Sequence, residues 1–159
     1  MKLTNWENNG AVRKPVRKAA MLILDTNHLR ELSYQSQIGL RLQDRLESAR
    51  VDAVITVVSA EELLKGRLAR IAAAHDGTDL TQAYERLTES ILFIADYTIV
   101  LWDDEAAARF AAFRAQGLRI GTLDLRIACI TLEHDATLLS RNTVDFAKVP
   151  GLRLENWLD

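Results

Sequence analysis

The sequence predicts an α/β fold in which helices cover both faces of a central parallel sheet. Short apolar runs rich in β-branched residues alternate with longer segments of helical periodicity. The first of these runs, residues 21–24, stops abruptly at Asp25, as a buried strand of a parallel sheet does. Because the carboxyl ends of such strands face the ligand crevice, Asp25 is expected at the mouth of a site.

The other elements follow from the same two patterns. Helical spacing predicts helices at residues 29–49 (two short ones), 59–74, 81–92, 104–116 and 122–133. Buried strands are expected at residues 53–57, 98–101, 136–139 and 152–154. Asp103 or Asp104 is expected to cap the fifth helix, and Thr122 to cap the sixth. Strands that alternate with helices in this way indicate a three-layer α/β/α sandwich.

Composition sets limits on the class of protein. A chain of 159 residues with 48% apolar and 26% charged residues is typical of one domain with an ordinary hydrophobic core. Its single cysteine, Cys129, excludes an internal disulfide and a cysteine zinc site, and its apolar surroundings predict a packing role. No apolar run suits a membrane span or a signal peptide, so a cytoplasmic protein is expected.

Residues 1–20 differ from the rest of the chain. They carry five basic residues against one acid, Glu7, and show no usable periodicity. This predicts a flexible basic tail before a domain of residues 21–159. Alternatively, the tail is a translational extension and Met21 is the natural start.

Four acids fall at element ends or in first helical turns: Asp25, Glu62, Asp124 and Asp145. Each also has a structural interpretation. Asp25 suits an N-cap, although Asn27 can serve that purpose, and the spacing of Glu62 favours a capping box with the serine at position 59. Asp124 suits the helix dipole, and Asp145 suits a loop turn.

If these acids converge, their chemistry is narrow. Clustered carboxylates without a lysine repel one another unless a divalent cation lies among them. Oxygen ligands favour Mg²⁺ or Mn²⁺ over zinc. Net charge is −2, and with four of the 22 acids committed to metal, 18 would remain against 20 bases, which permits contacts with phosphate. His28 is expected to line the rim of the site rather than bind metal.

Four segments together resemble a known family. They are Leu24–Asn27, Val57–Gly66, Ile120–Ala128 and Leu139–Phe146, followed by the tail Pro150–Trp157. In this order and spacing the sequence resembles the PIN domains, specifically the VapC-type ribonuclease toxins of bacterial toxin–antitoxin pairs. The match covers residues 21–158.

The resemblance implies a PIN-like fold and Mg²⁺-dependent endoribonuclease activity. Asp25, Glu62 and Asp124 match the acidic metal site of the family, which favours the site interpretation of Glu62. At the fourth position the sequence has Asn142 and, three residues on, Asp145, which is preferred as the acid. The four acids are thus the expected catalytic and metal-binding residues. The supporting polar residues are expected to be Thr26, Asn27, Ser140 and Asn142.

The resemblance also implies partners. These are an RNA substrate, a cognate antitoxin protein and a second copy of the chain in a homodimer. Arg126 and Arg141 lie near the predicted site and are candidates for the RNA backbone, although each also suits a solvated surface. The alternatives are a solitary PIN nuclease without an antitoxin, a catalytically idle PIN-like module and a phosphoacceptor receiver domain. The receiver would need a lysine at a late strand tip, whereas Lys148 lies beyond the predicted loop.

Overall fold

A five-stranded, all-parallel sheet forms the centre of the molecule. The structure is a computed structural model that describes residues 21–51 and 53–159. The strands are β1 (Leu22–Leu24), β2 (Ala53–Thr56), β3 (Ile99–Val100), β4 (Thr137–Leu139) and β5 (Arg153–Glu155). Their order in the sheet is β3-β2-β1-β4-β5, so β1 lies in the middle. The predicted tail and its alternative, a start at Met21, concern residues 1–20, outside the described part of the chain.

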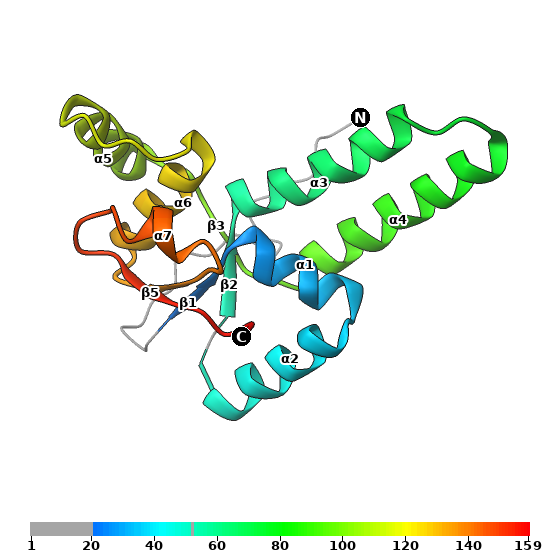
Figure 1. The fold of residues 1–159 in the computed structure, drawn as a ribbon, viewed down its shortest axis with the longest axis horizontal. Helices are drawn as coiled ribbons and strands as arrows, with labels where there is room; N and C mark the ends of the chain where they lie inside the picture. The colour runs from blue at the N-terminus through cyan, green and yellow to red at the C-terminus, as the bar shows by residue number, and fades with distance from the viewer. Residues whose placement is uncertain (1–20, 52) are drawn as a thin grey trace, which may run out of the picture.

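Helices connect the strands and lie on both faces of the sheet (Figure 1). The helices of the described residues are α1 (Thr26–Tyr34), α2 (Gln37–Ala49), α3 (Val57–Ala72), α4 (Gly77–Ala95), α5 (Asp104–Ala115), α6 (Thr122–Glu133) and α7 (Thr143–Phe146). In Figure 1, α3 and α4 form a long hairpin that projects from the body of the molecule. None of these helices combines the length and apolarity needed to cross a lipid bilayer.

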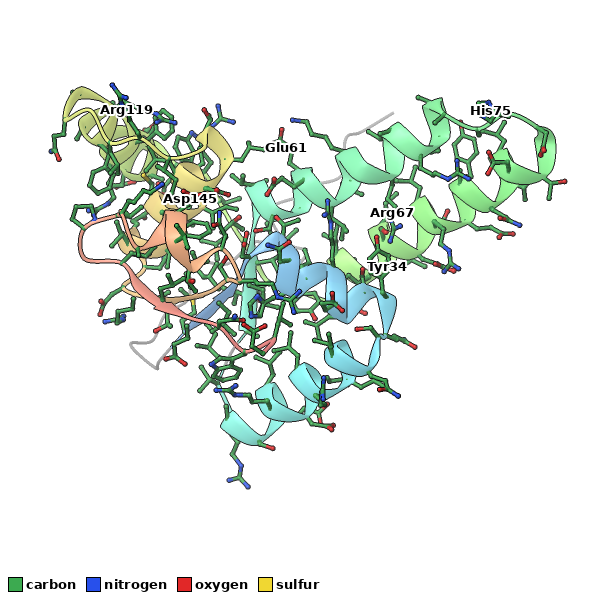
Figure 2. All side chains as sticks on the ribbon, viewed as in Figure 1. Tyr34, Glu61, Arg67, His75, Arg119 and Asp145 are labelled. Atoms are coloured by element: carbon green, nitrogen blue, oxygen red, sulfur yellow. The ribbon has the colours of Figure 1, made fainter. Side chains whose placement is uncertain are left out.

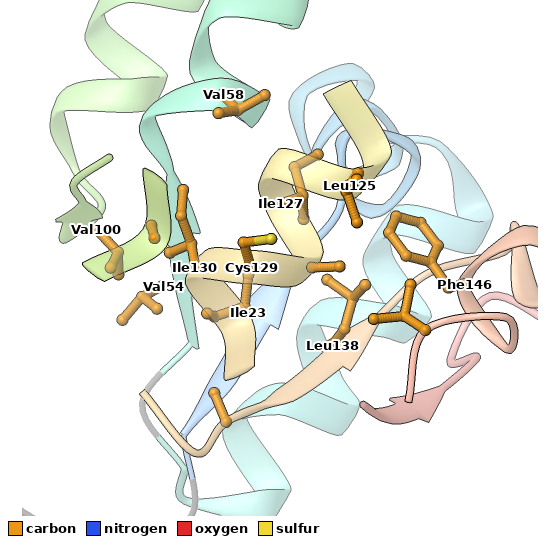
Figure 3. Packing of buried hydrophobic residues seen from close by; sticks show 14 of the residues in the cluster. Ile23, Val54, Val58, Val100, Leu125, Ile127, Cys129, Ile130, Leu138 and Phe146 are labelled. Atoms are coloured by element: carbon orange, nitrogen blue, oxygen red, sulfur yellow. The ribbon is translucent and has the colours of Figure 1, made fainter. Parts of the chain in front are cut away.

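Alternate strand residues supply two separate cores. Ile23, Val54 and Leu138 pack with the inner face of α6, where Cys129 is buried among them (Figure 3). Leu24 and Leu139 face the other way and pack with residues of α1, α2, α3 and α4. Burial on both faces explains why β1 is a continuous apolar run. The predicted three-layer α/β/α sandwich is confirmed, as is the packing role of Cys129.

Several helix ends differ from the prediction, and α4 is longer than expected, since it runs from Gly77 to Ala95 rather than over 81–92. Asp25, not Asn27, is the N-cap of α1, since its side chain accepts a hydrogen bond from the backbone of Thr26. The N-cap of α6 is Gly121, so the expected cap at Thr122 is wrong. The third helix starts two residues before the predicted Ser59, as described below. For α5, the prediction of Asp103 is confirmed.

Candidate functional site

Asp25 lies at the carboxyl end of the central strand and is buried. Its side chain is 4% exposed, and its backbone N–H donates to the carbonyl of Leu139 at 2.9 Å. One carboxylate oxygen accepts from the backbone N–H of Thr26 at 2.7 Å, and the other accepts from the hydroxyl of Ser140 at 2.6 Å. Parallel strands β1 and β4 therefore bring Asp25 and Ser140 together from positions 115 residues apart.

Glu62 reaches the same place from α3. Its carboxylate accepts a hydrogen bond of 2.6 Å from the hydroxyl of Thr26. The capping-box interpretation of Glu62 is wrong, because α3 begins at Val57 and its N-cap is Thr56, whose hydroxyl accepts from the backbone N–H of Ser59 at 2.9 Å. Ser59 in turn donates to the carbonyl of Leu24 at 3.2 Å. These bonds fix the start of α3 against the end of β1, and one helical turn later Glu62 faces Thr26.

Asn142 joins the two remaining acids. Its side-chain amide donates to Asp124 at 3.1 Å and to Asp145 at 3.2 Å, and its backbone N–H donates to the hydroxyl of Ser140 at 3.0 Å. A continuous chain of hydrogen bonds thus runs from Glu62 through Thr26, Asp25, Ser140 and Asn142 to Asp124 and Asp145. Asp25 directly follows β1, and the other three acids come from α3, α6 and α7; together with Thr26, Ser140 and Asn142 the four predicted acids form one polar chain.

The electrostatics of the four acids are unequal. Burial raises the pKa of Asp25 to about 6, and the charges of Asp124 and Glu62 add to this effect, while the bonds from Ser140 and Thr26 oppose it. Burial also raises the pKa of Asp124, with further increases from Glu62 and Asp145. Carboxylates that raise one another's pKa values lie close enough together for one bound cation to interact with all of them.

Asp145 is the exception. A hydrogen bond from Lys148, followed by the bond from Asn142, lowers the pKa of Asp145. The ammonium of Lys148 pairs with it, and the Asp145 side chain is 40% exposed. Figure 2 labels Asp145 on α7 and Glu61 on α3. Glu61 points away from the polar chain and pairs with Lys65 at 2.8 Å, so Glu61 and Glu62 have separate roles, as expected from their positions on the helix.

Asn27 and His28 directly follow Thr26 and differ in exposure, and the supporting role of Asn27 stays a prediction. Asn27 is exposed on α1, and no hydrogen bond ties it to the polar chain among the described residues. His28 does not line the rim: it is completely buried, and its Nε2 accepts from the backbone N–H of Trp157 at 3.2 Å. Burial lowers the pKa of His28 to about 4, so the imidazole is neutral near pH 7.

The two candidate arginines have other contacts. Arg141 forms an ion pair with Asp159, with 3.5 Å between Nε and the carboxylate oxygen. The guanidinium of Arg126 lies 5.9 Å from the ring centre of Trp102, and its charge contributes to lowering the pKa of Glu61. Of the two, Arg126 is the one near Glu61, in the N-terminal part of α3.

The polar chain suits a hard divalent cation by its donor chemistry. Asp25, Glu62 and Asp124 present oxygen ligands only, and among the described residues Asp145 is the one of the four acids that forms an ion pair with a lysine. Unneutralised carboxylates with raised pKa values are stabilised when a cation is bound. The carboxylate oxygens of the four predicted acids lie farther apart than the ligands around a bound ion. Within residues 21–51 and 53–159, one set of three acids brings ligand oxygens within 4.8 Å of one another, and it is a different set: Asp103, Glu105 and Glu133.

Sequence reasoning missed two residues that hold this arrangement. Thr56 sets the start of α3, and Arg114 donates to the loop before α6. Thr56 had a signal, because Thr is a common N-cap and it directly precedes the helical pattern. Arg114 had none, because its partners are backbone carbonyls.

Comparison of the sequence with known proteins agrees with the geometry. The chain is 27% identical to ribonuclease VapC1 of Haemophilus influenzae over 142 residues, which are 85% of this chain and 96% of that protein. It is 28% identical to the toxin FitB of Neisseria gonorrhoeae over 144 residues, 87% of this chain and all of that protein. No protein-family model matches the sequence.

Solved structures share the fold. The structure of VapBC from Salmonella typhimurium bound to DNA has a TM-score of 0.70 and 21% identity, with 87% of this chain and 99% of that chain covered. The FitAcB structure from Neisseria gonorrhoeae has a TM-score of 0.63 and 27% identity, with 86% and 98% covered. The resemblance inferred from the motifs is thus confirmed: the chain is similar in sequence to ribonuclease VapC1 and the toxin FitB, and it has a PIN-like α/β fold.

Proposed function

We propose that the chain is a metal-dependent endoribonuclease that hydrolyses RNA phosphodiester bonds and acts as the toxin of a toxin–antitoxin pair. The observation that carries the proposal is the hydrogen-bonded chain that links Glu62, Asp25, Asp124 and Asp145 at the carboxyl edge of the sheet. Relatives named ribonuclease VapC1 and toxin FitB support the activity and the toxin role. The proposed setting is the cytoplasm, where RNA is accessible.

In this proposal Asp25 and Asp124 hold a divalent cation, Mg²⁺ or Mn²⁺, with Glu62 or Asp145 completing the site. When bound, the cation supplies a Lewis acid that lowers the pKa of a water and offsets phosphate charge. Thr26 and Ser140 keep the carboxylates of Glu62 and Asp25 oriented through bonds of 2.6 Å each. Such fixed second partners hold ligands in place and raise their affinity for the ion.

The more exposed residues of the site can act on the attacking water and on the RNA. Glu62 is half-buried, so its carboxylate can orient the attacking water for in-line displacement at phosphorus. The side-chain amide of Asn142 donates to both Asp124 and Asp145 and so fixes the position of one carboxylate relative to the other. Arg126 is the candidate contact for the RNA backbone, because it lies near the site and is not ion-paired among the described residues.

The proposed antitoxin is a small protein that inserts an arginine into the carboxylate cluster and competes with the cation. Arginine pairs with carboxylates through a planar fork, and Asp25, Glu62 and Asp124 offer several acceptor oxygens. Solved structures with the same fold are described as a toxin–antitoxin complex and as a member of the VapBC family of toxin–antitoxin systems, which supports this partner. A homodimer is also proposed.

The test compares two neighbouring acids on α3. Purified wild-type protein is expected to cleave RNA with Mg²⁺ or Mn²⁺ and to lose cleavage in EDTA. Glu62→Gln and Asp124→Asn are expected to abolish cleavage while far-UV circular dichroism and thermal unfolding stay similar to wild type. Glu61→Gln is the matched control, since Glu61 is exposed and pairs with Lys65. Full activity of Asp124→Asn would overturn the proposal.

Co-expression with a candidate partner and labelling by acetyl phosphate distinguish the toxin from the alternative functions. Co-expression with the product of a small neighbouring gene should suppress cleavage and yield a complex if the chain is a toxin. Cleavage without any such suppressor would favour a solitary nuclease, and stoichiometric labelling by acetyl phosphate without cleavage would favour a phosphoacceptor domain.

A further inference from the structure

Arg114, near the end of α5, makes a set of contacts that the site described above does not use. Its Nη1 donates to the carbonyls of Leu118 at 3.1 Å and Ile120 at 3.0 Å, and its Nη2 donates to the hydroxyl of Thr122 at 3.3 Å. The guanidinium also lies 5.1 Å from the ring centre of Phe110, one helical turn earlier. One side chain thus binds three successive acceptors along the segment from α5 to α6.

Among the described residues, the other side-chain contacts of this segment are apolar, since Ile120 is buried in the core and Leu118 packs against it. Gly117 turns the chain out of α5 with a φ of +77°, and the amides of Gly117 and Leu118 donate back to α5. Gly121, the N-cap of α6, provides no side-chain cap. Within the described part of the chain, the guanidinium of Arg114 therefore supplies the side-chain hydrogen bonds that hold this loop. Figure 2 marks this end of the molecule by Arg119, which is exposed.

The segment leads directly into the acid site. Asp124 follows Thr122 by two residues and lies in the first turn of α6. The backbone at Gly121 lies against the Asp124 carboxylate, because a Cβ placed on this glycine would be 3.4 Å from Asp124 Oδ2. The same oxygen accepts from the side chain of Asn142 at 3.1 Å. A shift of the loop would therefore be transmitted to the Asp124–Asn142 bond.

We propose that Arg114 is a positioning residue that sets Asp124 against Asn142 by holding the α5–α6 loop. This deepens the proposed function and depends on it for its catalytic consequence. Arg114 acts through the loop, because its hydrogen bonds go to the carbonyls of Leu118 and Ile120 and to the hydroxyl of Thr122 rather than to Asp124. The planar fork of arginine suits this role, since it binds several oxygens in a fixed geometry.

The first test uses a spectroscopic signal that does not depend on activity. The side-chain amide of Asn142 reports its bond to Asp124 in a ¹H–¹⁵N spectrum of the full chain. Arg114→Met, which keeps the length and removes the donors, should shift that resonance and speed hydrogen exchange of amides 118–125 at least fivefold. Arg119→Met is the matched control, since Arg119 is an exposed arginine in the same loop, and it should change neither.

The second test measures the consequence for the site. In Arg114→Met the affinity for Mn²⁺, measured by calorimetry, should fall at least fivefold, and kcat for RNA cleavage should fall with KM nearly unchanged. Arg114→Lys, which keeps the charge and three donors, should restore part of each loss. An unshifted Asn142 amide together with Mn²⁺ affinity within twofold of wild type would overturn the proposal.

Two further outcomes remain informative. If Arg114→Met fails to fold, Thr122→Val removes one of the three contacts and should produce a smaller shift of the same Asn142 resonance; no shift in that variant overturns the proposal. If the wild-type chain neither binds Mn²⁺ nor cleaves RNA, the proposed function fails, while the Asn142 resonance still decides whether Arg114 positions Asp124.

Discussion

Replacing Asp25 with asparagine should make the metal-free protein more stable at neutral pH while removing its activity. Asp25 is 4% exposed, and burial is the largest cause of its raised pKa. A charged carboxylate at this position is therefore less stable in the folded chain than in the unfolded one. Asparagine has nearly the same shape but carries no charge: its side-chain oxygen can still accept from the backbone N–H of Thr26, and its amide can donate to the hydroxyl of Ser140.

The size of the effect follows from the two pKa values. The pKa of Asp25 is about 6 in the folded chain against 3.8 without perturbation. At about 1.36 kcal/mol per pH unit, charging this group costs roughly 3 kcal/mol of stability at pH 7–8. Because the folded state binds the proton more tightly, the cost is fully present above pH 6, decreases as the pH falls from 6 to 3.8, and vanishes below that.

The assay is urea unfolding in EDTA at several pH values. Asp25→Asn should raise the free energy of unfolding by about 1–3 kcal/mol at pH 8, by less at pH 5, and not at all near pH 4. Asp145→Asn is the control, since Lys148 lowers the pKa of this exposed acid and its removal should not stabilise. A less stable Asp25→Asn protein at pH 8 in EDTA would refute the reasoning.

Three further changes test the contacts around the site. Gly39→Ala should destabilise by about 1–3 kcal/mol in thermal or urea unfolding, because a Cβ on Gly39 would overlap the carbonyl of Glu31 where α1 and α2 meet; a neutral effect would contradict this packing. Thr56→Ala should cost about 1 kcal/mol as a lost N-cap and lower cleavage, since it frees the start of α3; Thr56→Ser should recover both. Ser140→Ala should raise the pKa of Asp25 further and shift the acid limb of the pH–rate profile upward, and an unchanged profile would contradict the hydrogen bond as described.

The fold was predictable because its signals are local. Buried strands are short apolar runs and amphipathic helices repeat every three to four residues, so each element could be recognised within its own segment. The position of Asp25 at the end of β1 followed from the abrupt change after Leu24, since a continuous apolar run indicates burial on both faces of the sheet. Element type therefore required no information from distant parts of the chain.

The helix ends were less predictable because several polar residues compete for each cap. Ser59 and Glu62 satisfy the capping-box spacing, yet Thr56 takes the cap, and Ser59 instead donates to the carbonyl of Leu24. That carbonyl is 35 residues away in sequence, and only the packing of α3 against β1 makes it available. The same tertiary contact releases Glu62 for Thr26. Local spacing could not separate these two outcomes.

The hydrogen bonds of the site explain why chemically similar acids have different pKa values. Asp25 is anchored by two donors beneath the surface, whereas Asp145 is exposed and compensated by Lys148. The pKa of Asp25 is raised and that of Asp145 is lowered, so Asp145 stays charged at a pH where Asp25 takes up a proton.

Since a bound cation requires deprotonated ligands, the buried acid Asp25 should limit ion binding at low pH. Apparent affinity for Mn²⁺ should accordingly fall as the pH is lowered below about 6 in wild type, as calorimetry can measure, and Asp145→Asn should leave that midpoint in place. A midpoint that moves with Asp145 instead would assign the limiting proton to the exposed acid.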